Sequence, residues 1–133
     1  MRLLLASLIF CAGLNGGEYA VVTSAKSQIE TLGKKSIRDL FLKKRTFYES
    51  TELFAINLTP SNNAREEFER KVLEMARDDL NEYWIINHYK GIKPPIVQRS
   101  EAGVKEFVKN RPNFIGYLPK SLLDGDMKVL YEF

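Results

Sequence analysis

Four short segments of the chain predict β-strands, because apolar residues alternate with polar ones or run together in them. Each segment is rich in β-branched or aromatic residues and is bounded by turn-forming residues. The four segments are residues 18–24, 52–58, 113–118 and 128–133. In 52–58 apolar side chains lie on both faces of the predicted strand, which is typical of a sheet that helices cover on both faces.

Between these segments, apolar residues recur three and four positions apart, and this spacing predicts amphipathic helices. The expected helices are residues 37–43, about 62–76, 78–89 and 100–110. Ser36, with Asp39 three residues later, fits the N-cap of the first helix, and Ser100 fits that of the last. The order of strands and helices predicts an α/β layer fold with a mostly parallel sheet of about four strands.

The start of the second helix has two interpretations. Asn63 with Glu66 three residues later matches a capping pair. Thr59 followed by Pro60 matches an N-cap with proline at the first helical position. Both place a helix start directly after the strand at 52–58, so the boundary is open by about one turn.

Glycines and prolines mark the remaining connections. Gly91 is expected to end the third helix, and Pro94-Pro95 requires an extended segment that crosses from one layer to the next. Gly116, inside a predicted strand, indicates the close approach of another backbone or a ligand. Residues 119–126 are expected to form a turn with one helical turn.

The first residues predict a secretory signal peptide over residues 1–17, followed by a single domain over 18–133. Arg2 precedes an apolar run, residues 3–14, which is shorter than the 18 or so residues of a membrane span. Cleavage after any of residues 13–17 fits the requirement for small side chains. We therefore expect an exported, periplasmic protein with no membrane span after cleavage.

Cys11 is the only cysteine and lies inside this apolar run, so no disulfide is expected in the exported chain. The bulky Phe10 before it argues against a lipid anchor on Cys11. The net charge of +3 falls to +2 when Arg2 is removed with the signal peptide. This small excess gives no indication of nucleic-acid binding.

The residues needed for most catalytic sites are absent or isolated, so we do not expect an enzyme. His88 is the only histidine, so almost no residues are available for histidine-containing triads or for metal sites with histidine ligands. Glu66-Glu67 and Asp78-Asp79 are adjacent on helices and point in different directions. The aspartates fit a role at the helix start, where a negative charge interacts favourably with the positive end of the helix dipole. No phosphate loop or dinucleotide motif occurs, and we expect no cofactor or metal.

Two features indicate binding. The stretch 56–68, INLTPSNNAREEF, leads from a strand through a turn into a helix, and free backbone N–H groups at a helix start attract anions. Residues 34–45 hold six basic side chains and only one acid, Asp39. They form either a positive face for an acidic partner or an ordinary solvated helix face. Tyr83 and Trp84 stand at helical spacing, which favours core packing over ligand stacking.

Several runs, in this order, resemble the periplasmic phosphate-binding proteins of ABC importers, and specifically a half-size branch of them. The resemblance covers residues 19–133. The similar runs are residues 36–48 (SIRDLFLKKRTFY), 62–68 (NNAREEF), Tyr83-Trp84, Gly91 with Pro94-Pro95, and 113–117 (NFIGY). The resemblance implies a single lobe of the type II periplasmic-binding-protein kind, similar to the second lobe of the full-length proteins.

The resemblance also implies a phosphate site at the helix start, with a Ser-Gly-Thr run and an arginine four residues before it. Here the run is Asn62-Asn63-Ala64 and the arginine position is Leu58, whereas Arg65 matches. The hydroxyls and the charge-assisted bonds of the arginine are therefore missing. The predicted ligand-binding residues are Ser61, Asn62, Asn63 and Arg65.

Two functions follow as hypotheses. The first is a solute-binding-like protein that binds phosphate or a related oxyanion near Asn62 and works with an ABC permease. The second is an interaction or sensory accessory module that has lost phosphate binding and contacts an envelope partner, such as a sensor, through residues 34–45.

Overall fold

The structure is a computed structural model that describes residues 17–133. Residues 1–16, with Cys11 and nearly all of the predicted signal peptide, lie outside the described part. Within 17–133 no helix combines the length and the apolar character needed to cross a membrane.

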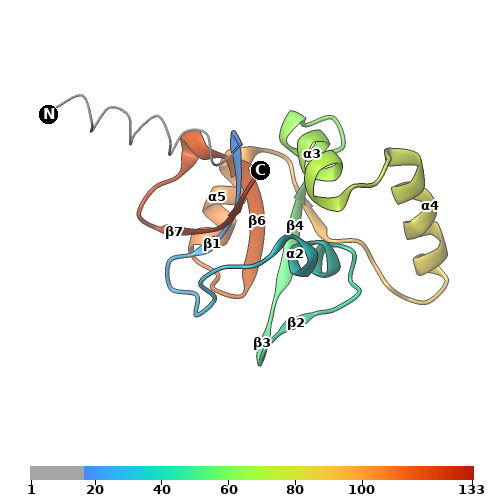
Figure 1. Cartoon of the computed structure of the whole chain (residues 1–133), viewed down its shortest axis with the longest axis horizontal. Coiled ribbons are helices and arrows are strands. Elements are labelled where there is room, and N and C mark those ends of the chain that lie inside the picture. Colours follow the sequence, from blue (N-terminus) through green and yellow to red (C-terminus); the bar gives the residue numbers. More distant parts are fainter. Residues whose placement is uncertain (1–16) are drawn as a thin grey trace, which may run out of the picture.

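A five-stranded sheet forms the centre of the fold, in the order β5-β4-β6-β1-β7 (Figure 1). Strands β4 and β5, and β4 and β6, pair in parallel, whereas β1 pairs antiparallel with both β6 and β7. Only β1 therefore runs against the other four. The strands are β1 Tyr19–Ser24, β4 Phe54–Leu58, β5 Ile96–Gln98, β6 Phe114–Pro119 and β7 Met127–Glu132. This arrangement confirms the predicted α/β fold with a mostly parallel sheet.

Sequence patterns missed the shortest strands. Strand β5 has three residues, too few for alternation to be visible, and it follows the extended Pro94-Pro95 segment where only a crossing was expected. A small hairpin of β2 (Phe47–Tyr48) and β3 (Thr51–Glu52) precedes β4. The turn after β6 contains the expected single helical turn, the 3-10 helix η2 over Lys120–Leu122.

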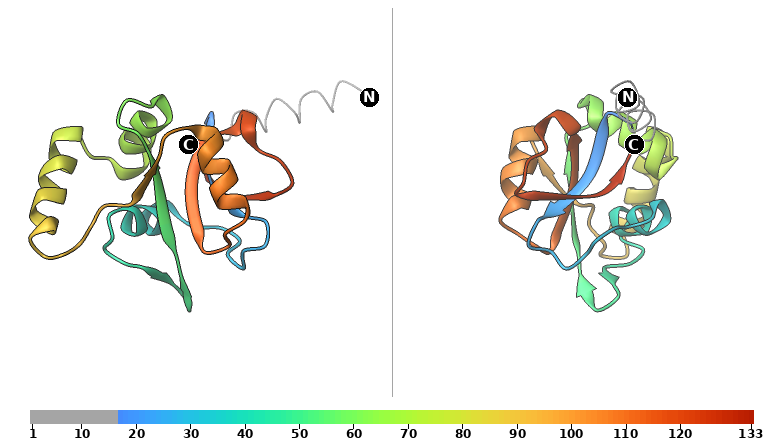
Figure 2. Two further views of the ribbon diagram at one scale, coloured as in Figure 1. Left: turned by 180° about the vertical axis from the view of Figure 1, so that it is seen from behind. Right: turned by 60° about the vertical axis from the view of Figure 1, so that its left-hand side comes forward.

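Helices cover both faces of the sheet (Figure 2). Helix α5 (Glu101–Lys109) lies on one face, and α2 (Lys34–Phe41) and α3 (Asn63–Phe68) lie on the other. A π-helical turn, η1 (Glu69–Leu73), continues α3. Helix α4 (Arg77–His88) lies at one end of the molecule, beyond α3 and β4.

The start of the first predicted helix and the end of the second differ most from the predictions. Helix α2 starts after Gly33 rather than after Ser36, because the Gly33 carbonyl accepts from Ile37 N at 3.1 Å. Asp39 is paired with Lys35 at 2.9 Å and does not act as a capping partner.

The second predicted helix ends early, at Leu73 instead of Ala76. Glu74 adopts a left-handed backbone, with φ 55°, and its carboxylate pairs with Lys34 at 2.9 Å and Arg38 at 2.7 Å. These two bonds hold the chain in a sharp turn, after which Ala76 becomes the N-cap of α4. The last expected helix matches α5, with Ser100 as its cap: the Ser100 hydroxyl accepts from Gly103 N at 2.9 Å.

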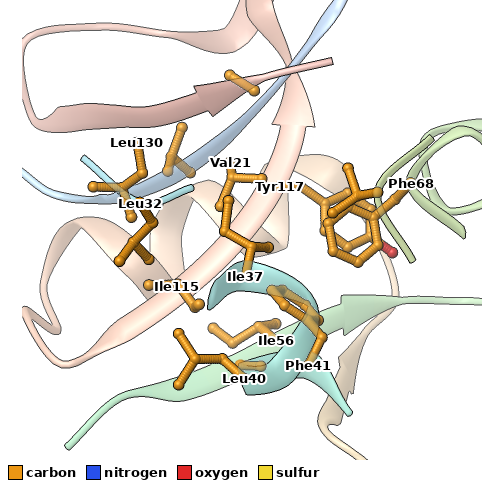
Figure 3. Close-up of a cluster of buried hydrophobic side chains, with 14 of the residues drawn as sticks. Val21, Leu32, Ile37, Leu40, Phe41, Ile56, Phe68, Ile115, Tyr117 and Leu130 are labelled. Carbon is orange, nitrogen blue, oxygen red and sulfur yellow. The ribbon is translucent and has the colours of Figure 1, made fainter. Parts of the chain in front are cut away.

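The core lies between the sheet and α2 and α3, and aromatic rings fill its centre (Figure 3). Phe68 stacks on Tyr117 with ring centres 4.2 Å apart, and Phe41 packs against Phe68 at 4.6 Å. On the other face, Gly116 allows a close approach, as predicted, but of a helix side chain. A Cβ at Gly116 would lie 2.8 Å from Val104 Cγ1 of α5, so a larger residue would push α5 off the sheet.

Candidate anion-binding site

The predicted anion-binding turn lies where ligands usually bind in open α/β sheets, outside the carboxyl ends of parallel strands. Residues 59–62 follow the end of β4, Ser100 and Glu101 follow β5, and Pro119 ends β6. Because these three strands are parallel, their carboxyl ends meet at one edge of the sheet. The start of α3 and the start of α5 are neighbours there (Figure 1).

Asn62, rather than Asn63 or Thr59, caps helix α3. Its backbone is extended, and its side-chain Oδ1 accepts from Ala64 N at 2.7 Å and from Arg65 N at 3.3 Å. The Asn62 N–H itself donates to Thr59 O at 3.0 Å and closes the turn. Two of the N–H groups expected to bind an anion are therefore occupied by the side chain of the capping residue.

The other end of the Asn62 amide meets a carboxylate. Asn62 Nδ2 donates at 3.3 Å to Oε2 of Glu101, the first residue of α5. The Asn62 amide therefore bonds on both sides. Its oxygen accepts from the N–H donors of the helix, and its nitrogen donates to the negatively charged Glu101. An anion at this position would be repelled by Glu101.

Acidic side chains also lie around Asn63, the exposed first residue of α3. It lines a shallow hollow of about 330 Å³ together with Tyr19, Lys71 and three glutamates, Glu18, Glu66 and Glu67. A hydrogen bond from Arg70 lowers the pKa of Glu67, so this carboxylate is charged at neutral pH. Three carboxylates against one lysine make the hollow unfavourable for an oxyanion.

Arg65, which matches the resemblance, is committed inside the fold. Its Nε donates to Glu69 Oε2 at 2.8 Å and its Nη1 donates to Leu58 O at 2.8 Å. Glu69 is 5% exposed and receives a second guanidinium, because Arg77 Nε donates to Glu69 Oε1 at 2.7 Å. Arg77 Nη2 donates to Pro60 O at 3.0 Å.

We call Arg65, Glu69 and Arg77 the arginine clamp. It joins α3, the π-helical turn and α4 through one carboxylate. It also binds the carbonyls of Leu58, directly before the turn, and of Pro60, inside it. Charge-assisted hydrogen bonds of this kind are stronger than those between neutral groups. The clamp therefore fixes the position of the turn and engages two nitrogens of each guanidinium group to do so.

Hydrogen bonds between the end of β4 and β6 also support the turn. The Tyr117 hydroxyl donates to Asn57 Oδ1, and the Leu58 N–H approaches both Asn57 Oδ1 at 3.0 Å and the Tyr117 oxygen at 3.4 Å. Burial raises the pKa of Tyr117 above its ordinary value of 10.0, so the hydroxyl stays neutral and keeps its proton for Asn57.

The four predicted site residues are thus neighbours on one turn but differ in what they can offer. Ser61 and Asn63 are exposed, whereas Asn62 and Arg65 are bonded within the fold. Sequence patterns missed the groups that bind them. Arg65 and Glu69 stand four residues apart on one helix face, a spacing that does indicate a pair. Nothing local connects Asn62 with Glu101.

Most of the basic segment 34–45 is also paired. Lys34 and Arg38 bind Glu74, Lys35 binds Asp39, and Arg45 Nε donates to Phe47 O at 2.8 Å. In the described part of the chain, Lys43 and Lys44 take part in no ion pair. The positive face is therefore limited to these two side chains and Arg45.

The other residues that the sequence suggested for catalysis or ligand stacking pack in the fold or lie at its surface. Asp78 and Asp79 occupy the first turn of α4, as predicted, and His88 is exposed in its last turn. Tyr83 donates to Leu42 O at 2.7 Å, and both Tyr83 and Trp84 pack against the core. Between residues 17 and 133 no three side chains of the metal-binding types gather in one place.

No protein-family model and no curated protein sequence matches this chain. Solved structures do match. A protein described as a phosphate ABC transporter substrate-binding protein, with bound phosphate, from Clostridium perfringens aligns with a TM-score of 0.68 at 16% identity, over 85% of this chain. An ABC-type phosphate transport receptor from Vibrio cholerae gives 0.67 at 14% identity over 85%, and PstS from Borrelia burgdorferi gives 0.65 at 12% over 86%.

The match covers 44–46% of each of these proteins, so this chain spans less than half of their length. The identities are low, and the likeness is one of fold. It agrees with the resemblance found in the sequence: the chain has the fold of a single lobe similar to those of phosphate-binding proteins of ABC transporters.

Proposed function

We propose that this chain is an exported accessory module built on a solute-binding-protein lobe, and that it acts by contacting an envelope protein instead of holding phosphate on its own. One observation carries the proposal. The side chain of Asn62 occupies the N–H groups of Ala64 and Arg65 and places the carboxylate of Glu101 beside them.

The charge balance of the turn supports this proposal. An oxyanion near Asn62 would have to displace the cap and approach Glu101, and it would compete for Arg65 with Glu69 and Leu58 O. Displacing an N-cap alone costs about 1 kcal/mol. A single lobe would also leave one side of the ligand in water, where its bonds with the protein are weaker.

The partner surface in this proposal is the remaining positive face, Lys43, Lys44 and Arg45. An acidic segment of an envelope sensor or of a permease has the matching charge. Changing Lys43 and Lys44 to glutamate should weaken recovery of that partner from envelope extracts, with Lys26→Glu as the matched control on another exposed loop. Equal recovery with all variants would remove this face from the proposal.

A second candidate function is weak oxyanion binding in association with an ABC permease. It is favoured by the position of the turn at the carboxyl edge of the sheet and by bound phosphate in the Clostridium perfringens structure. In this chain the exposed donors for it are the side chains of Ser61 and Asn63.

Calorimetry distinguishes the two functions. Phosphate, sulfate and small carboxylates are titrated into the exported chain and into Asn62→Asp, which keeps an N-cap but adds a negative charge. The proposal predicts no binding heat at millimolar ligand for either protein. Saturable heat with the natural chain that disappears in Asn62→Asp would establish the second candidate instead.

A further inference from the structure

Helix α4 exposes large apolar side chains on the side that faces away from the protein. Seven large hydrophobic residues of the described chain are exposed, and six of them lie on α4, on β5 or on β4 beside it. These six are Phe54, Ile85, Ile86, Tyr89, Ile96 and Val97. The most exposed is Tyr89, at 85%.

The opposite side of α4 already attaches the helix to the fold. Leu80 and Asn87 are buried, Tyr83 donates to Leu42 O, and Arg77 belongs to the arginine clamp. Leu80, Tyr83 and Asn87 follow one another at spacings of three and four and form the inward stripe. Ile85 and Tyr89 stand on the reverse side. A helix with apolar residues on both sides is normally buried on both sides.

Four of these six exposed apolar side chains line two hollows that have a residue in common. A hollow of about 570 Å³ is lined by Trp84, Ile85, Tyr89 and Pro94 among others. A second hollow, of about 370 Å³, is lined by Phe54, Ile96 and again Pro94. Because both hollows share Pro94, the surface runs continuously from the outer face of α4 to the edge strand β5. We call it the α4–β5 surface.

Charges at the two ends of α4 indicate what covers this surface. Asp78, Asp79 and Glu82 stand in its first half, and Lys90 and Lys93 follow its last turn, with Ile85 and Ile86 between. Within residues 17–133, none of these five charged groups takes part in an ion pair. A second α4 laid antiparallel would bring acids against bases at both ends and isoleucines together in the middle.

We propose that two copies of this chain associate through their α4–β5 surfaces, with the α4 helices antiparallel and Glu82 of each copy facing Lys90 of the other. Such an interface is isologous: each pair occurs twice, related by a two-fold axis. An anionic membrane would favour a rim of one sign, which this surface lacks.

Sedimentation velocity of the exported chain over a micromolar concentration series tests the proposal. The natural chain should be a dimer, and the double variant Ile85→Glu, Ile86→Glu should be a monomer with an unchanged circular dichroism spectrum. Phe47→Glu is the matched control, since Phe47 is 49% exposed but lies on β2, outside the α4–β5 surface. It should remain dimeric.

Charge reversal tests the antiparallel arrangement itself. Glu82→Lys alone and Lys90→Glu alone should each weaken the dimer about tenfold, because two exposed attractive pairs become repulsive. A mixture of the two single variants should dimerise like the natural chain, since each reversed charge then faces its opposite. The variant with both reversals should also recover.

Three results would overturn the proposal: a natural chain that is monomeric throughout the series, a dimer that survives Ile85→Glu, Ile86→Glu, or a mixture of single variants no tighter than either alone. Vesicles of anionic phospholipid serve as a comparison, and binding of a monomeric natural chain to them would assign the surface to a membrane. These outcomes do not depend on phosphate binding, so a failure of the dimer and a failure of the proposed function can be distinguished.

Discussion

The arginine clamp joins the turn before α3 to the start of α4, yet this turn and the outward face of α4 differ in how their polar and apolar groups are used. In the turn, where a ligand was expected, Asn62 and Arg65 are bonded to groups of the protein itself. On α4, where no function was expected, apolar and charged groups face the solvent without partners in the described chain. Groups that already bond within the protein would have to break those bonds to bind a partner, whereas the exposed groups on α4 would not. The comparison therefore favours α4 over the turn as a binding surface.

The largest effect should come from removing the carboxylate at the centre of the arginine clamp. Glu69→Ala leaves two guanidinium groups partly buried without their acid, and breaking such a pair destabilises a fold by about 3 kcal/mol. Urea unfolding measures the loss. Glu67→Ala is the control on the same segment, because Glu67 pairs with Arg70 and Lys71 at the surface and should change stability by less than about 0.5 kcal/mol. Equal losses in the two variants would show that the clamp does not hold the turn.

Tyr117→Phe should have the next largest effect, about 1–2 kcal/mol, because Asn57 and the Leu58 N–H lose a buried partner while the ring packing is kept. Thermal unfolding and urea unfolding should agree on this loss. A neutral result would mean that Asn57 finds another donor.

Tyr117 also predicts a change of stability at alkaline pH. Its pKa is raised in the folded protein above the ordinary 10.0, so its contribution is complete below pH 10 and is lost as pH rises from there toward the folded pKa. The natural chain should therefore lose stability above pH 10 more steeply than Tyr117→Phe. Parallel pH profiles would contradict the assignment.

Asn62→Ala should cost about 1 kcal/mol, because the N–H groups of Ala64 and Arg65 lose their cap. Asn62→Asp should keep the cap but place a second carboxylate beside Glu101. We expect its stability to lie between those of the natural chain and Asn62→Ala, measured by urea unfolding. A loss in Asn62→Asp larger than in Asn62→Ala would mean that repulsion from Glu101 outweighs the cap.

The smallest effect should come from the outward face of α4. Under conditions that keep the chain monomeric, Ile85→Ala should change the free energy of unfolding by less than about 0.5 kcal/mol, as expected of an exposed site. Leu80→Ala, on the buried side of the same helix, should cost about 3 kcal/mol. Similar losses would mean that Ile85 is packed in the monomer and that the two sides of α4 do not differ.

Sequence patterns were informative where a structural feature is local. The four longer strands, the helices and the Ser100 cap follow from periodicity and capping chemistry. Strand β5 was too short for alternation to show, and the end of the second helix depends on Glu74 meeting Lys34 and Arg38, about 40 residues away in sequence. The candidate site shows the same limit, since the position of the turn was predictable but its bond to Glu101, 39 residues away, was not.

The most direct test of the central claim is an NMR titration of the ¹⁵N-labelled chain over residues 18–133 with phosphate, observed at the backbone amides of residues 61–65. The account predicts shifts that stay small and grow linearly with added salt, matched by a chloride control, because the capping side chain already occupies the Ala64 and Arg65 N–H groups. Saturable shifts confined to these amides at submillimolar phosphate would contradict it.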